Sequence, residues 1–246
     1  MKINRNAWWH GIMCGGAIAL GSVTTAPLTP SRVVGNEYEA GFEPHLDLST
    51  ESQLNSAIWG RFGGLLADFA WIKVYRAWAR KDLPELRVSL KRVRALNPHG
   101  VGFWLNGARM LGYDATAWRQ REAGKEFESS IRLEQLSEAI LFLGDGRILN
   151  PGRYEFGLEE AVLRMRLAGD LSGAVAELES IEEMPNLPYF VGRVRGELLV
   201  RLGRKEEALA WLRNFEQTLP RADLDAQHEV VTQRIRDLER SIEGLE

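Results

Sequence analysis

A short turn pattern occurs twice in this chain, and the distance between its two copies limits the folds that the chain can adopt. Gly169 and Gly203 are 34 residues apart, and each is followed five residues later by an alanine, Ala174 or Ala208. A glycine at the end of a helical segment is typical of a left-handed C-cap, and a small residue in the next helix lets two helices pack closely. A fixed period of this length indicates stacked helix-turn-helix units.

The composition favours the same all-α class. Leu, Ala, Arg, Glu and Gly are the commonest residues, and runs of β-branched residues, which lose rotamer freedom in helices, are scarce. The formal net charge is −3 and 26% of the residues are charged, so the chain has no excess charge that would attract nucleic acid. We therefore expect neither a sheet nor a nucleic-acid partner.

The last two units carry a recognisable pattern. Counting from Tyr189, the eighth, twentieth and thirty-second positions are Gly196, Ala208 and Pro220. Counting from Glu155 places Ala174 at the twentieth position, although a valine replaces the small eighth residue and the proline comes one position early. This pattern resembles the tetratricopeptide repeat (TPR) family, and the resemblance is clearest over residues 155–220. It implies a TPR-like α-solenoid of about four units.

The earlier units depart from this period. Leu-Asn-Pro ends an apolar segment at residues 96–98 and again at 149–151, and the two prolines are 53 residues apart. We therefore expect an insertion of about 19 residues at 114–132, as a longer helix or a loop.

Apolar residues at three- and four-residue spacing mark a helix at each end of the repeats. The first begins after residue 50, ends near Arg80, and includes Leu65, Leu66, Phe69, Ile72, Tyr75 and Trp78. The last follows Pro220, includes Leu224, Val231, Ile235, Leu238 and Ile242, and is predicted to cap the solenoid.

The N-terminus has the features of a segment that enters a membrane. Lys2 and Arg5 precede a stretch from Ala7 to Ala26 without a charged residue. Residues 1–26 are thus predicted to be a membrane anchor or a cleaved signal peptide, residues 27–49 a linker, and residues 50–246 the helical repeat domain. The repeat domain is expected to be extracytoplasmic, either anchored or exported.

Residues suited to catalysis or metal binding are scattered. The four His, at positions 10, 45, 99 and 228, do not pair at metal-ligand spacing, and Cys14 is the single cysteine. Gly144-Asp145-Gly146 lacks the rest of a nucleotide-binding motif, and the pair Glu159 and Glu160 is expected on a solvated helix face. We predict no metal, no cofactor and no enzymatic activity.

The resemblance implies that one side of each first helix lines a concave groove. Asn106, Arg109 and Tyr113 form the sharpest candidate, because Arg and aromatic residues contribute strongly to protein interfaces. Alternatively, Tyr113 packs against the inserted segment. Asp68 is expected to form an internal ion pair with Arg76 or Arg109. The other candidate groove residues are Arg166, Phe190, Arg193 and Glu197.

These observations predict a protein-binding scaffold or adaptor of the cell envelope, attached to the membrane through its N-terminal segment. Two alternatives remain open. One is a purely structural subunit of a membrane-associated complex, and the other is a membrane-associated enzyme whose site is too dispersed to recognise.

Overall fold

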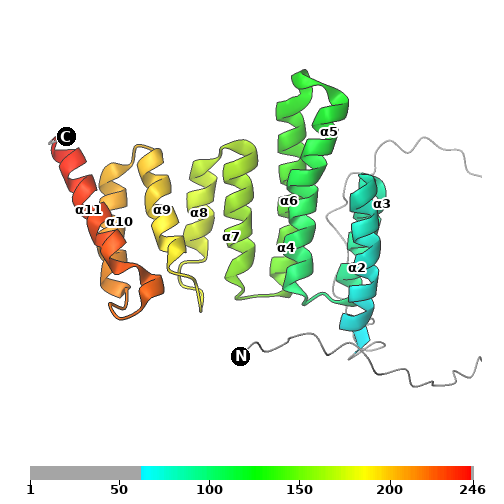
Figure 1. The fold of residues 1–246 in the computed structure, drawn as a ribbon, viewed down its shortest axis with the longest axis horizontal. Coiled ribbons are helices and arrows are strands. Elements are labelled where there is room, and N and C mark those ends of the chain that lie inside the picture. The colour runs from blue at the N-terminus through cyan, green and yellow to red at the C-terminus, as the bar shows by residue number, and fades with distance from the viewer. Residues whose placement is uncertain (1–61, 245–246) are drawn as a thin grey trace, which may run out of the picture. The chain divides into compact units, whose positions relative to one another are not determined.

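A computed structural model describes residues 62–244, and all regular structure within them is helical (Figure 1). The all-α prediction is therefore confirmed for this part of the chain. The predicted membrane segment at 1–26, the linker at 27–49 and the start of the first helix lie outside the described residues. The helices are α2 (Gly63–Arg80), α3 (Leu83–Leu96), α4 (Val101–Arg109), α5 (Ala115–Ala123), α6 (Glu128–Leu149), α7 (Tyr154–Leu163), α8 (Leu171–Ser180), α9 (Phe190–Arg201), α10 (Lys205–Thr218) and α11 (His228–Glu243).

The helices pack as successive antiparallel neighbours. α2 packs against α3, α4 against α6, α7 against α8, α9 against α10, and α11 against α10. Each pair is joined to the next by further helix contacts, such as those of α6 with α7 and of α8 with α9. The chain between residues 62 and 244 is thus a series of helix pairs followed by one closing helix.

The turns that the sequence pattern singles out contain left-handed glycines. Gly169 has φ +66° and Gly203 has φ +76°, and each ends a helical segment. The side chain of Asp170 then accepts a hydrogen bond from the backbone N–H of Gly173 at 2.8 Å, which caps α8. A residue with a Cβ is strained at these φ values, which is why glycine occupies both turns.

The small repeat residues lie where helices approach each other. Ala174 and Ala208 are buried near the starts of α8 and α10. A Cβ placed on Gly196 of α9 would lie 2.8 Å from Cδ2 of Leu212 on α10. Pro220 follows the end of α10 by two residues.

The predicted insertion at 114–132 lengthens both helices of the second pair. α4 continues through a π-helical segment, Met110–Asp114, directly into α5, and the chain reverses at Gly124 before α6 begins at Glu128. Trp118 and Ile131 are buried within this extension. A one-residue π bulge shifts the register of a helix, and here it separates the repeat-like part of the helix from the inserted part.

Two apolar clusters form the core. The first extends from α2 to α7 and centres on Trp104, Phe142 and Phe156, with the rings of Trp104 and Phe142 4.8 Å apart. The second extends from α7 to α11 and includes Ile181, Leu199, Leu212 and Leu238. Both run through the contacts between successive helix pairs, so each pair depends on its neighbours for burial.

The apolar stripe predicted on the first helix does not face this core. The buried residues of α2 are Gly63, Ala67, Val74 and Ala77. Trp71 also packs against the core, but most of the larger apolar side chains are exposed on the opposite side. We call that side the outer face of α2; its exposed apolar members are Phe62, Leu65, Phe69, Ile72, Tyr75 and Ala79. Small residues meet α3 because the two helices pack closely along their full length.

The prediction that Asp68 forms an internal ion pair was wrong. Asp68 is exposed and makes no ion pair among residues 62–244, and Arg109 pairs with Glu159 instead. The expected closing helix is present as α11, with Val231, Ile235 and Leu238 buried. Leu224 is not part of it: it lies in a short 3₁₀ turn, Leu224–Ala226, and is 92% exposed.

Candidate functional site

The sharpest candidate from the sequence lies where α4 faces α7. Arg109, at the end of α4, donates two hydrogen bonds to the carboxylate of Glu159 on α7, from Nε at 2.9 Å and from Nη2 at 2.5 Å. Glu159 is buried, so its expected position on a solvated face was wrong. The bidentate pair holds two first helices together, since a buried carboxylate without such a partner is costly.

Tyr113 lies beside this pair, in the π-helical segment that follows α4. Burial raises the pKa of its phenol, and the neighbouring Glu159 also raises it, whereas Arg166 and Arg109 lower it. Its hydroxyl is buried and has no hydrogen-bond partner among the described residues. A buried hydroxyl without a partner is uncommon, and here the O–H donor of Tyr113 is left unsatisfied.

The charges of Glu159, Arg166 and Arg109 all act on the phenol of Tyr113, and Arg109 also pairs with Glu159. Asn106 is exposed one turn earlier on α4. Tyr113 also packs against the first core cluster, to which Ala115 and Trp118 of the inserted segment belong. Glu159 is the member whose role the sequence did not indicate.

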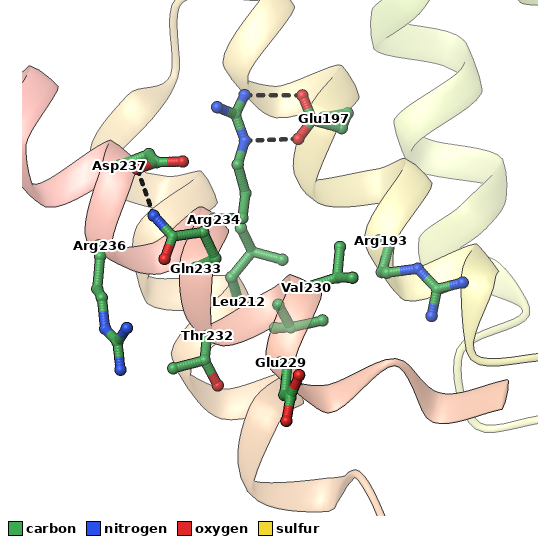
Figure 2. A pocket seen from close by; sticks show the side chains of 11 residues that line it. Arg193, Glu197, Leu212, Glu229, Val230, Thr232, Gln233, Arg234, Arg236 and Asp237 are labelled. Carbon is green, nitrogen blue, oxygen red and sulfur yellow. Dashed lines mark hydrogen bonds and ion pairs between the residues drawn. The ribbon is translucent and has the colours of Figure 1, made fainter. Parts of the chain in front are cut away.

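The remaining predicted residues form a second set, on α9. Arg193 donates from Nη1 to the backbone carbonyl of Ala226 at 3.1 Å. Glu197 accepts two hydrogen bonds from Arg234 of α11, at 2.6 Å from Nε and 2.8 Å from Nη2 (Figure 2). Phe190 is exposed at the start of the helix. Glu197 therefore attaches the closing helix to α9, and Arg193 attaches the turn that precedes that helix.

A groove of about 910 Å³ lies between α9 and α11, beside these residues. Leu212 of α10 and the exposed Val230 of α11 give it an apolar part, and charged side chains of both signs surround that part (Figure 2). The charged lining residues include Arg193, Glu197, Glu229, Arg236 and Asp237. An apolar patch within a polar rim is the usual composition of a protein-binding surface.

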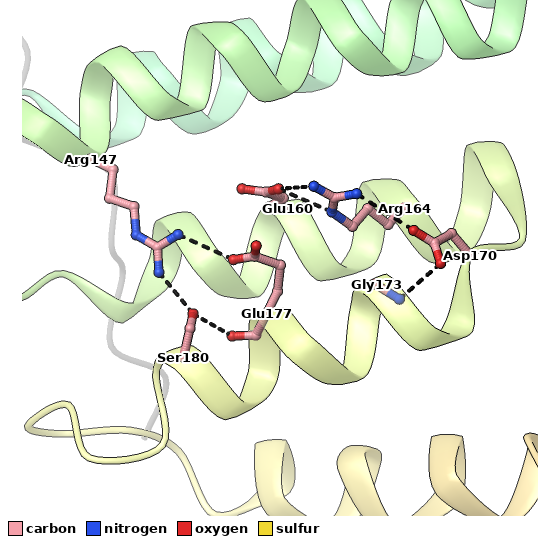
Figure 3. Close-up of polar contacts among 7 residues, drawn as sticks. All are labelled: Arg147, Glu160, Arg164, Asp170, Gly173, Glu177 and Ser180. Atoms are coloured by element: carbon pink, nitrogen blue, oxygen red, sulfur yellow. Dashed lines mark hydrogen bonds and ion pairs between the residues drawn. The ribbon is translucent and has the colours of Figure 1, made fainter.

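A third polar cluster connects α6, α7 and α8. Arg147 donates from Nη1 to Glu177 at 3.1 Å, and Arg164 donates to Glu160 from Nε at 3.0 Å and from Nη2 at 2.6 Å (Figure 3). Glu160 is buried, which raises its pKa; Glu177 raises it further, while Arg164 and Arg147 lower it. The Arg147–Glu177 pair is a joint between α6 and α8, and the Arg164–Glu160 pair, four residues apart within one helical segment, lies beside it (Figure 3).

Residues 62–244 contain no cluster of three or more His, Cys, Asp or Glu side chains arranged to hold a metal ion. His99 lies 3.1 Å from the carbonyl oxygen of Leu149, and His228 lies beside Thr232. His10, Cys14 and His45 lie outside the described residues. Within the same part of the chain, no helix combines the length and the hydropathy needed to cross a membrane.

The chain was compared with models of protein families, with curated proteins and with solved structures, and none of them matches it.

Proposed function

We propose that the protein is a TPR-like scaffold of the cell envelope that binds a protein partner along the first helices of its helix pairs and along α11. The groove between α9 and α11 carries this proposal. It offers an exposed apolar residue, Val230, with charges of both signs around it, which suits a peptide or helix that has one apolar anchor and mixed charges.

The cluster around Tyr113 supports a second contact region. The buried hydroxyl of Tyr113 has no partner among the described residues, and Asn106 and Arg166 are exposed nearby. Asn106 and Arg166 supply an exposed amide and an exposed guanidinium, which can bind the backbone of an extended partner. Arg109 is already bonded to Glu159, so it holds α4 against α7.

The envelope location comes from the sequence. Lys2 and Arg5, followed by the uncharged stretch from Ala7 to Ala26, are typical of an anchor or export signal, and they place the helical domain on the outer side of the membrane. The partner is accordingly an envelope protein.

Site-specific photocrosslinking of the full chain in cells tests the proposal. A photoreactive phenylalanine analogue at Val230 is expected to capture one reproducible partner, and the same analogue at Ile148, an exposed apolar residue of α6, is not. Reversing the nearby charge with Arg236→Glu is expected to weaken the capture, because Arg236 lines the groove and is exposed. Equal capture from Val230 and Ile148 would contradict the groove.

The Tyr113 region is tested with different variants. Arg109→Ala is unsuitable, since it would leave Glu159 buried without its partner. Asn106→Ala with Arg166→Ala removes two exposed groups and leaves that pair intact. Unchanged capture of the partner by this double variant would restrict binding to the α9–α11 groove.

A further inference from the structure

The outer face of α2 is apolar although the helix already buries its other side. Ala67, Val74 and Ala77 are in the core, while Phe62, Leu65, Phe69, Ile72 and Tyr75 are each more than half exposed. A helix with large apolar residues on two sides is normally covered on both sides. Exposed apolar residues gathered along one helix face mark an interaction surface.

The spacing on this face is that of a helix that pairs with another helix. Leu65, Phe69, Ile72, Arg76 and Ala79 follow one another at intervals of four, three, four and three residues, and all five are exposed. Intervals of four and three alternate in a heptad repeat, in which such residues form the seam of a two-stranded coiled coil. The single Arg in the seam lowers stability but favours one register.

Charged and aromatic residues lie on the two flanks of this seam. Asp68 precedes Phe69, and Lys73 follows Ile72; both are exposed, and neither makes an ion pair among residues 62–244. In a parallel, in-register pair, a residue on the first flank faces the residue five positions later on the second flank of the other helix. Asp68 of each copy would therefore face Lys73 of the other, and Tyr75 would face Arg80.

We propose that the outer face of α2 is a homodimer interface in which two copies pair in parallel and in register. The face is self-complementary, as a two-fold interface requires. An antiparallel pair would instead bring like flanks together, with Lys73 on the same side as its own counterpart. A membrane fits less well, because Asp68 would have to enter the apolar layer beside Ile72 and Tyr75. The proposal is independent of the partner groove.

Cysteine cross-linking of the full chain in membranes tests the geometry. On a Cys14→Ser background, single cysteines at Leu65, Ile72 and Ala79 are each expected to form a disulfide with the same residue of a second copy, since seam positions bring Cα atoms to about 6 Å. Ile148→Cys is the control, because Ile148 is also an exposed helical isoleucine. Cross-linking no greater than the control at all three positions overturns the proposal. Cross-linking at Ile72 alone would indicate an antiparallel pair and overturns the parallel register.

Charge exchange tests the chemistry. Asp68→Lys and Lys73→Asp are each expected to weaken dimerisation of the detergent-solubilised full chain about fivefold or more, and the double exchange is expected to restore it. Sedimentation velocity over a range of concentrations measures this. A monomer at every concentration, or a double exchange that does not recover, overturns the dimer.

Lipid as the occupant is distinguished by a fluorescent label on Ile72→Cys in reconstituted vesicles. In the dimer, the label responds to dilution of the protein and Asp68→Lys reduces that response. A signal that follows the fraction of anionic lipid, ignores dilution and increases with Asp68→Lys would show that the face binds the membrane, and overturns the proposal.

Discussion

Helix pairs in the two halves of the described chain are joined in different ways. Between α3 and α6, and between α4 and α7, arginines bind carboxylates that are largely buried: Arg87 with Glu138, Arg94 with Asp145 and Arg109 with Glu159. Between α8 and α9, and between α9 and α11, arginines bind exposed carboxylates, such as Glu179, Glu182 and Glu197.

The difference follows the insertion. The three ion pairs of the first half connect residues that are 50 or 51 positions apart in the sequence. The separation is this large because α5 and the extension of α6 lengthen the second unit. Leaving a buried carboxylate without its guanidinium partner is costly, so these ion pairs select one register between the helices that they join. Close glycine contacts occur in both halves: a Cβ on Gly146 would lie 2.7 Å from Trp104, and one on Gly196 would lie 2.8 Å from Leu212. Shape therefore restricts the stacking throughout, and buried charge is added to it in the first half.

Removal of one guanidinium from each half is the strongest test of this contrast. Arg87 and Arg234 are matched: both form bidentate pairs between helices, and their side chains are 36% and 35% exposed, but Glu138 is 8% exposed and Glu197 46%. Arg87→Ala is expected to lower the free energy of unfolding by about 3 kcal/mol, since it leaves a buried carboxylate without its cation.

Arg234→Ala is expected to cost less than about 1 kcal/mol, because water solvates the exposed Glu197. Urea denaturation followed by circular dichroism measures both values. Equal losses for the two variants would show that the halves do not differ in the way that the burial of their carboxylates indicates.

The close contact in the second half predicts the next effect. Gly196→Leu is expected to destabilise the protein by about 2 kcal/mol, because a Cβ at this position already lies 2.8 Å from Cδ2 of Leu212. Gly102→Leu is the control: Gly102 is exposed in α4 and a Cβ there has no atom within 4 Å. A melting curve of Gly196→Leu that coincides with that of the control would contradict the role of shape at this contact.

Part of the fold and part of the candidate site were predictable from the sequence. The helical class and the turns at Gly169 and Gly203 were predictable, because a left-handed turn demands a specific residue and the spacing of those residues is visible. Of the candidate site, Arg109 and Arg166 both act through their charge on Tyr113. The 34-residue spacing could not reveal Glu159 as the partner of Arg109, because the insertion places the two residues 50 positions apart.

The outer face of α2 shows a second limit. Periodicity identified apolar residues at helical spacing from Leu65 to Trp78, but α2 has apolar residues on both sides, and periodicity does not state which side is buried. The smaller residues, Ala67, Val74 and Ala77, are the buried ones. Helix packing favours small residues where backbones approach, so residue size was the available signal.

The joint between the two halves predicts the smallest effect, a change in pH dependence. Glu160 connects to Arg164 at the junction of α6, α7 and α8, and burial is the main cause of its raised pKa (Figure 3). A group whose pKa is higher in the folded than in the unfolded state stabilises the fold fully below the unfolded pKa. That stabilisation is lost as the pH rises through the folded pKa.

Glu160→Gln stays neutral at every pH. The free energy of unfolding of this variant is therefore expected to fall further below that of the parent protein near pH 4 than near pH 8, about the range in which a glutamate with a raised pKa titrates. Denaturation at several pH values, with Glu206→Gln at an exposed site of α10 as the control for net charge, measures the difference. A gap between parent and Glu160→Gln that widens as the pH rises would mean that the bond to Arg164, and not burial, dominates at this carboxylate. The junction would then belong to the half of the molecule in which buried charge is added to shape.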